Sequence, residues 1–365
     1  MLDLLVFIII LSILIFVHEI GHYLVAKKSG IKVEEFGFGI PPKIWGKKIG
    51  ETTYSINALP IGGFVRMAGE NEEEEGSKER QFVHKPASVR ALVTIAGVVM
   101  NFLLAIFIFS FIYTKLGIPT PTDQVRIVAV APNSPAEQSG LSEGDIVLKA
   151  NNQVIKETQE FIQLTQKSVG ESMTLEIKRG DQIQKIKVET RQNPPENEGP
   201  IGVGISNIEN KFYPFWEMPI RGAIEGVKES IGWMVLIVEG LGTMVYRLFT
   251  SGAVPQDVAG PVGIYQITGA VAKLGFLPTL RLLGLLSINL AVVNLLPIPA
   301  LDGGRLLFIA IEAVARKRVK TQVEALAHQI GFAFLIALII LLTYHDIVRI
   351  AGTTDLAGRL REILP

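Results

Sequence analysis

The chain has 365 residues, no cysteine and a formal net charge of zero, and 48% of its residues are hydrophobic. Its mean hydropathy of +0.38 is high for a soluble protein and indicates several membrane spans combined with polar domains. The balanced charge gives no indication of nucleic-acid binding. The lack of cysteine excludes a disulfide framework and a cysteine zinc site, so a metal would need histidine and carboxylate ligands.

The first apolar run, residues 4–26, is long enough to cross a bilayer, which takes about 20 residues. We expect a retained span, because the start of the chain lacks the basic region and the cleavage site of a signal peptide. Lys27 and Lys28 follow the run. The positive-inside rule then places the N-terminus outside and this end of the span in the cytoplasm.

Residues 18–22 of this run have the sequence His-Glu-Ile-Gly-His. On a helix, His18 and His22 lie one turn apart on the same face, so both imidazoles can bind one metal ion. Glu19 lies one position further round, where its carboxylate can act as a general base on a water at the metal. The alternative is a chance motif on a surface helix. Ionisable groups at membrane depth are costly and usually functional, which favours the metal site.

Residues 50–68 are expected to form a β-hairpin on the cytoplasmic side, in which Thr52–Leu59 pairs with Phe64–Met67. An exposed edge of this hairpin could bind an unwound substrate as an added strand. Gly62 and Gly63 would permit close approach of that substrate. A purely structural hairpin is the alternative.

The second predicted span covers residues 91–114. Gly97 would allow a neighbouring helix to approach closely, and Asn101 needs a polar partner inside the bundle. Asn101 is a candidate substrate-binding residue, with helix packing as the alternative.

Residues 122–192 are expected to form a soluble α+β domain. A strand at 126–130 precedes a short helix that begins near Ser134, and a helix at 158–166 precedes a hairpin at 172–190. This order of elements resembles a PDZ domain of the bacterial membrane-protease and periplasmic-protease type. The resemblance implies binding of a peptide by strand addition, and a spacer that only blocks access is the alternative.

The C-terminal half contains two further predicted spans, at 282–301 and 326–344. A catalytic zinc needs a third protein ligand and an open position for water. Asp302 is the candidate third ligand, because it follows a span that prolines and glycines break at its end. The other histidines have no partner at ligand spacing and are expected to be ordinary polar residues: His84, His328 and His345.

The number of spans decides whether Asp302 can meet the two histidines. With four spans, Asp302 reaches the cytoplasmic half of the membrane, where His18 and His22 lie. A fifth span at 231–249 would place Asp302 on the opposite side, and the basic run at 316–320 would violate the positive-inside rule. We therefore predict amphipathic surface helices at 221–250.

Several motifs, taken together, resemble those of the site-2 protease family of intramembrane zinc metalloproteases, and most closely the bacterial regulator-of-sigma-E protease group. They are His18–His22, Gly97 with Asn101, Gly260–Gly263 and Asn294–Gly304, and they are spread over nearly the whole chain. The resemblance implies a Zn²⁺ ion bound by His18, His22 and Asp302, and a re-entrant hairpin at Tyr54–Met67. It also implies that Asn294 hydrogen-bonds the substrate backbone or the oxyanion. A single PDZ-like domain is a departure, since some members carry two in tandem.

The fold class expected is a polytopic α-helical membrane protein with four transmembrane helices, a membrane-associated β-hairpin and one inserted extracytoplasmic PDZ-like domain. The expected parts are an N-terminal membrane half at 1–116, the PDZ-like domain at 122–192, surface helices and linker at 200–275, a C-terminal membrane half at 276–350 and a tail at 351–365.

The expected activity is hydrolysis of membrane-anchored, single-pass substrates in a bacterial inner membrane. By resemblance, these are pre-trimmed anti-sigma factors or remnant signal peptides. A peptide ligand of the PDZ-like domain is an expected further partner. Two other classes are weighed: a non-catalytic PDZ-bearing membrane scaffold and a metal transporter. The scaffold predicts loss of a ligand or of the base, yet all four residues are present. The transporter predicts further polar residues along several spans, and the fourth span has almost none.

Overall fold

The computed structural model describes residues 2–70, 77–195, 198–251, 259–317, 319 and 321–352. The chain divides into two compact units. The membrane unit comprises Met1–Lys115 and Pro219–Pro365, and the inserted unit, Leu116–Met218, interrupts it in sequence. The predicted tail lies outside the described residues beyond Gly352.

Among the described residues, four helices are long and apolar enough to cross a membrane, as predicted. They are α1 (Leu2–Lys28), α2 (Ala87–Leu116), α7 (Phe276–Leu295) and α9 (Thr321–Gly352). Large apolar side chains remain exposed on these helices; Phe107 is 70% exposed and Ile340 is 63% exposed. Such surfaces are expected where lipid is the solvent.

The end of α7 differs from the prediction, which extended this span to residue 301. The helix ends at Leu295, and Leu296 has an extended backbone with φ −62° and ψ 140°. Leu296 precedes Pro297, and the residue before a proline avoids the helical region because its backbone clashes with the proline ring. The residues up to Leu301 therefore form a loop, and helix α8 (Asp302–Ala315) begins after it.

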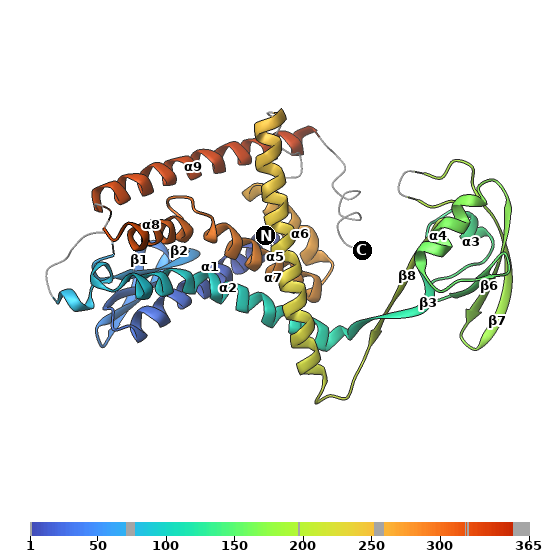
Figure 1. Ribbon diagram of the computed structural model, residues 1–365, viewed down its shortest axis with the longest axis horizontal. Helices are drawn as coiled ribbons and strands as arrows, with labels where there is room; N and C mark the ends of the chain where they lie inside the picture. The colour runs from blue at the N-terminus through green and yellow to red at the C-terminus, as the bar shows by residue number, and fades with distance from the viewer. Residues whose placement is uncertain are drawn as a thin grey trace. The chain divides into compact units, whose positions relative to one another are not determined.

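Residues Met218–Ser251 form one 34-residue helix, α5, where several surface helices were predicted. Helix α5 is not among the candidate spans of the described residues, and the exclusion of a span at 231–249 stays a prediction. In Figure 1, α5 runs across the directions of α2 and α9. Glu229 on α5 accepts a hydrogen bond of 2.9 Å from Arg281 on α7, which fastens α5 to the helix bundle. The shorter helix α6 (Pro261–Lys273) follows.

The hairpin of the membrane unit is larger than predicted. Strand β1 (Val33–Ile49) pairs with β2 (Thr52–Met67), and two 3₁₀ turns, Lys78–Arg80 and Phe82–His84, lead from it to α2. The predicted pairing within residues 52–67 is wrong, because Phe36 of β1 has register partners in both Tyr54 and Val65. Part of β1 thus lies between the two halves of β2, a long-range arrangement that local β-propensity does not reveal.

The inserted unit has one sheet with the strand order β7-β6-β4-β3-β8, and β5 pairs with β4. Its elements are β3 (Ile118–Val130), α3 (Pro135–Gln138), β4 (Ile146–Ala150), β5 (Gln153–Val154), α4 (Thr158–Lys167), β6 (Ser172–Arg179), β7 (Gln182–Glu189) and β8 (Val203–Lys211). The predicted domain at 122–192 omits β8, which pairs with β3 from Ile118 to Val130. Strand β8 follows a Pro-rich stretch and pairs with β3 at the start of the domain. Such a long-range pairing cannot be predicted from local sequence.

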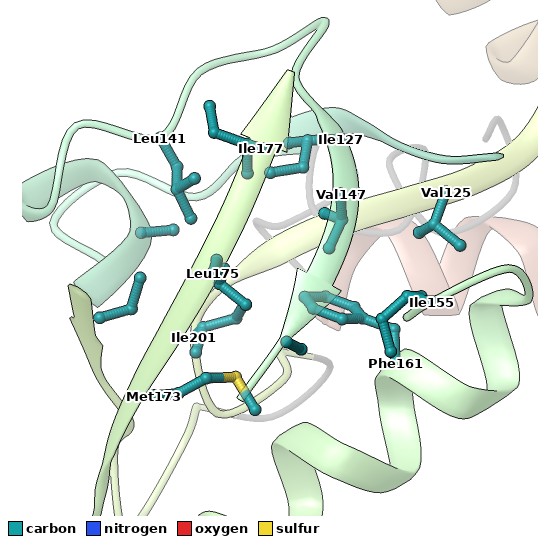
Figure 2. Packing of buried hydrophobic residues seen from close by; sticks show 13 residues of the cluster. Val125, Ile127, Leu141, Val147, Ile155, Phe161, Met173, Leu175, Ile177 and Ile201 are labelled. Atoms are coloured by element: carbon teal, nitrogen blue, oxygen red, sulfur yellow. The ribbon is translucent and has the colours of Figure 1, made fainter. Parts of the chain in front are cut away.

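The apolar core of the inserted unit lies between this sheet and α4. Figure 2 shows Phe161 of α4 pointing toward Val147 and Ile155, with Leu175 and Met173 of β6 nearby. All five side chains are buried. Burial of each such side chain stabilises the fold by about 1.5–3 kcal/mol relative to exposure.

Candidate metal centre

Helix α1 places two imidazoles at one point inside the membrane unit. His18 and His22 are separated by one helical turn, and both side chains are buried. Their Nε2 atoms lie 3.1 Å apart. The predicted pairing of these two histidines on one helix face is therefore present, because α1 stays helical from Leu2 to Lys28.

Asp302 reaches the same point from the start of α8. Its Oδ2 atom lies 2.9 Å from Nε2 of His18 and 3.3 Å from Nε2 of His22. Among the described residues, these three form the one group of His, Cys, Asp or Glu with ligand atoms close enough to hold a metal ion. The topological argument for Asp302 thus agrees with its position.

The spacing of the three ligand atoms fits zinc. Ligands about 2.0–2.1 Å from a tetrahedral zinc ion lie about 3.3 Å from one another. The three observed separations run from 2.9 to 3.3 Å. Two imidazole nitrogens and a carboxylate oxygen at this distance need a cation between their lone pairs, and a tetrahedral ion would leave a fourth position open for water.

The other nitrogen of each imidazole is held by α2. Nδ1 of His22 donates a hydrogen bond of 2.8 Å to the carbonyl oxygen of Val93. The side-chain amide of Asn101 lies 3.4 Å from Nδ1 of His18, and its Oδ1 atom is buried with no partner in the described part of the chain. Turning the amide by half a turn lets Oδ1 accept from Nδ1–H. Both Nε2 atoms are then free to bind metal.

The predicted contact of Asn101 with a substrate stays a prediction. Its side chain has no exposed surface in this structure and lies beside His18. Its own backbone carbonyl accepts a hydrogen bond of 2.8 Å from Ser287 on α7. Sequence reasoning could name a polar group in need of a partner but not the partner.

Glycines let α1 and α2 approach closely enough for these contacts. A Cβ atom at Gly97 would lie 2.5 Å from Nε2 of His22 and 2.6 Å from Cε1 of His18. A Cβ atom at Gly21 would collide with the backbone of Ala96. The predicted close approach at Gly97 is present, and the groups that approach it are the imidazole rings of His18 and His22.

Two cavities lie beside the candidate ligand residues. One, of about 200 Å³, is lined by His22 and by Phe64, Val65 and Met67 of β2, and the other, of about 250 Å³, is lined by Asn294 and Leu290 of α7. His18, Glu19 and Asp302 line both. Glu19 thus faces the space in which a substrate would meet the metal.

The glycines of β2 lie beside the same space. A Cβ atom at Gly63 would be 3.6 Å from Cγ of Glu19, and one at Gly62 would be 3.4 Å from Cδ1 of Ile15. Gly62 also has a φ of +91°, which residues with a side chain rarely adopt. Of the predicted residues, Asn294 therefore lines the site, and Gly62 and Gly63 lie beside residues that line it.

Two ion pairs that the sequence analysis did not anticipate hold α8 in place. Arg305 pairs with Glu70, just after β2, at 2.5 Å, and Arg90 of α2 pairs with Glu312 at 2.7 Å. Burial by itself lowers the pKa of Arg305, but the Glu70 carboxylate offsets this and raises the pKa above its usual value. The first pair joins the end of the β2 strand to the helix that presents Asp302.

Comparison with known proteins agrees with this geometry. The model of Peptidase family M50 matches residues 6–338. The zinc metalloprotease RasP of Geobacillus kaustophilus is 32% identical over 93% of this chain and 96% of the relative. The regulator of sigma-W protease RasP of Bacillus subtilis is 30% identical over 94% of this chain and 98% of the relative. That alignment spans 423 residues against 365 in this chain, so the relative contains segments that are absent here.

Part of the chain is also similar to a solved structure. The PDZ domain of an SdrC-like protein from Listeria monocytogenes is 24% identical, with a TM-score of 0.21, and the match covers 24% of this chain and 93% of the domain. The family itself follows from the match to most of the sequence. This chain belongs to peptidase family M50, the site-2 proteases, and is a multi-pass membrane protein with the activity of an intramembrane zinc metalloprotease.

Proposed function

We propose that this protease hydrolyses a peptide bond within the membrane segment of single-pass substrates, at the centre formed by His18, His22 and Asp302. The observation that carries the proposal is the convergence of these three ligand atoms within 3.3 Å of one another inside the membrane unit. A zinc ion held by these residues would supply Lewis-acid chemistry for the attacking water and the scissile carbonyl.

Two side chains around the centre carry out proton transfer and hydrogen bonding to the substrate. The Glu19 carboxylate takes a proton from the attacking water and delivers it to the nitrogen of the leaving amine. Its place on the wall of both cavities supports this role. The Asn294 side-chain amide donates a hydrogen bond to the substrate backbone or to the developing oxyanion from the opposite wall.

The substrate binds as an extended strand along the second half of β2. A transmembrane helix has its backbone hydrogen bonds satisfied internally, so it must unwind before it can be cut. Phe64, Val65 and Met67 line the cavity beside the ligands, and within the described part of the chain this stretch has register partners in β1 alone. Their free edge is suited to strand addition, and Gly63 leaves room next to Glu19.

The proposed orientation is supported by charge. Lys27 and Lys28 at the end of α1 favour a cytoplasmic location of that end, with the N-terminus outside. The zinc centre then lies in the cytoplasmic half of a bacterial inner membrane. The inserted unit follows α2, which returns the chain to the outer side, so this unit is extracytoplasmic.

The substrate class follows from the relatives and from this orientation. The Bacillus subtilis relative is named a regulator of sigma-W protease. We assign pre-trimmed anti-sigma factors and remnant signal peptides to this chain as substrates. The inserted unit, as a PDZ-like domain, would bind a peptide or exclude substrates whose outer domain has not been removed.

The decisive experiment replaces Glu19 with Gln in the full chain, reconstituted in lipid. We expect zinc to be retained and cleavage of a membrane-anchored reporter to be lost, because the amide cannot accept the proton. Glu225→Gln on α5, where the carboxylate pairs with Lys228, is the matched control and should cleave normally. Unchanged cleavage by Glu19→Gln would refute the assigned base. Zinc transport into vesicles that survives this substitution would support the transporter instead.

A further inference from the structure

The loop that presents Asp302 contains a strained residue. Ala300, two positions before Asp302, has a φ of +79°, in the region that favours glycine. A residue with a Cβ atom is held there only when its surroundings stabilise it. The surroundings of Ala300 therefore bear on the position of the metal ligand.

The contact that stabilises this conformation comes from α9. The backbone N–H of Ala300 donates a hydrogen bond of 2.9 Å to Nδ1 of His328, which lies 28 residues further along the chain. The His328 ring also lies against Phe308 of α8, with ring centroids 5.9 Å apart. His328 thus touches both the loop and the helix that follow α7.

A second residue of α9 packs against the same loop. Gly331 lies three positions after His328 and so on the same face of the helix. A Cβ atom at Gly331 would collide with the carbonyl group of Pro299. The start of α9 therefore packs closely on the backbone of residues 299 and 300.

The environment of the half-buried His328 ring indicates the role of the imidazole. Its Nε2 atom is buried and has no hydrogen-bond partner in the described part of the chain. A buried polar atom without a partner is unfavourable, and an aromatic ring at this position would avoid that cost. The bond from Ala300 to Nδ1 is the interaction that distinguishes a histidine here from a phenylalanine.

We propose that His328 is a positioning residue for the zinc centre, which holds Ala300 at positive φ and thereby aims the Asp302 carboxylate at His18 and His22. This inference rests on the proposed ligand role of Asp302. His328 acts through the loop and does not touch the metal. Loss of its acceptor would let the loop relax and turn Asp302 away from the two imidazoles.

The test measures zinc affinity by chelator competition on the full-length, lipid-reconstituted protein. His328→Phe keeps a ring against Phe308 and removes the acceptor; we expect about 10–100-fold weaker zinc binding. His328→Asn offers an amide oxygen near the Nδ1 position and should restore most of the affinity. His345→Phe, on the same helix but away from the loop, is the matched control and should bind zinc normally.

A double variant separates positioning from general damage to α9. Glycine adopts positive φ without strain, so Ala300→Gly should remove much of the need for His328. We expect His328→Phe to weaken zinc binding far less in the Ala300→Gly background than alone. Equal losses in both backgrounds, or no loss at all with His328→Phe, would overturn the proposal.

One further variant distinguishes this failure from failure of the proposed function. Asp302→Asn should lose zinc if the ligand set is correct. Normal zinc binding by Asp302→Asn would refute the ligand set itself. Loss with Asp302→Asn and none with His328→Phe would refute only the positioning role.

Discussion

The two units bury different kinds of side chains in their interiors. The inserted unit buries an apolar core around Phe161 and Leu175, and Asp145 is the charged residue that it buries among the described residues. The membrane unit buries His18, His22 and Asn101, while large apolar side chains on its spans stay exposed. The membrane unit also buries an apolar cluster around Phe109 and Ile288, but its interior holds polar groups beside that cluster. The candidate chemistry lies in this second interior.

The largest expected effect tests whether the inserted unit owes its stability to its apolar core. Phe161→Ala should lower the free energy of unfolding of this unit by about 3–5 kcal/mol, because it removes buried contacts and leaves a cavity. Hydrogen exchange of the β4 and β6 amides in the full chain measures this loss. Zinc affinity should not change, and a fall in zinc affinity would contradict the separation of the two interiors.

A smaller but specific effect is expected in the polar interior. Gly97→Ala places a Cβ atom 2.5 Å from Nε2 of His22, so the ligand rings must shift. We expect about 100-fold weaker zinc binding, measured by chelator competition. Gly240→Ala is the control, since a Cβ atom there meets nothing within 4 Å. If both variants bind zinc equally well, the close packing of α2 on the ligands is not required.

The ion pair beside the site should affect substrate more than metal. Glu70→Gln removes the charge that pairs with Arg305 and loosens the end of β2 from α8. We expect kcat/KM for a membrane-anchored reporter to fall on the order of tenfold, mainly through KM, with zinc affinity retained. The exposed Glu79→Gln is the matched control. A matching loss of zinc would show that the pair supports the metal ligands instead.

The smallest effect concerns a charged pair at the rim of the apolar core. Burial by itself raises the pKa of Asp145, but hydrogen bonds from Arg179 and from the Ser142 backbone N–H more than offset this, so the pKa lies below its usual value. Its contribution to stability is therefore complete above the unfolded pKa of about 4 and is lost as the pH falls through the folded pKa.

Replacement of the Asp145 carboxylate should make the free energy of unfolding of the inserted unit less dependent on pH in the acidic range. Asp145→Asn should cost the inserted unit about 1 kcal/mol at neutral pH. It should also remove part of the stability loss between pH 4 and lower pH, as followed by hydrogen exchange. Asp181→Asn in the turn between β6 and β7 is the control. An unchanged acid dependence would show that Asp145 contributes nothing there.

The type of activity and the candidate spans could be predicted because they depend on short-range patterns. The His18 and His22 pair follows from helical spacing, and the spans follow from apolar runs of sufficient length. Asp302 was found by combining those spans with the positive charges at their ends. Each of these patterns involves residues that are close together in sequence. The candidate site could therefore be largely predicted from the sequence.

Long-range contacts decided the remainder. Phe36 of β1 pairs with both halves of β2, and β8 closes onto β3, because strand partners are chosen by burial and packing across the chain. Asn101 lies beside His18. His328 was expected to be an ordinary polar residue, but it accepts a hydrogen bond from Ala300. A buried polar group must find a partner, but only the packed structure determines which one. The sequence by itself determined the number of candidate spans and pointed to His18, His22 and Asp302 as candidate ligands, and the tertiary structure decided how their side chains converge.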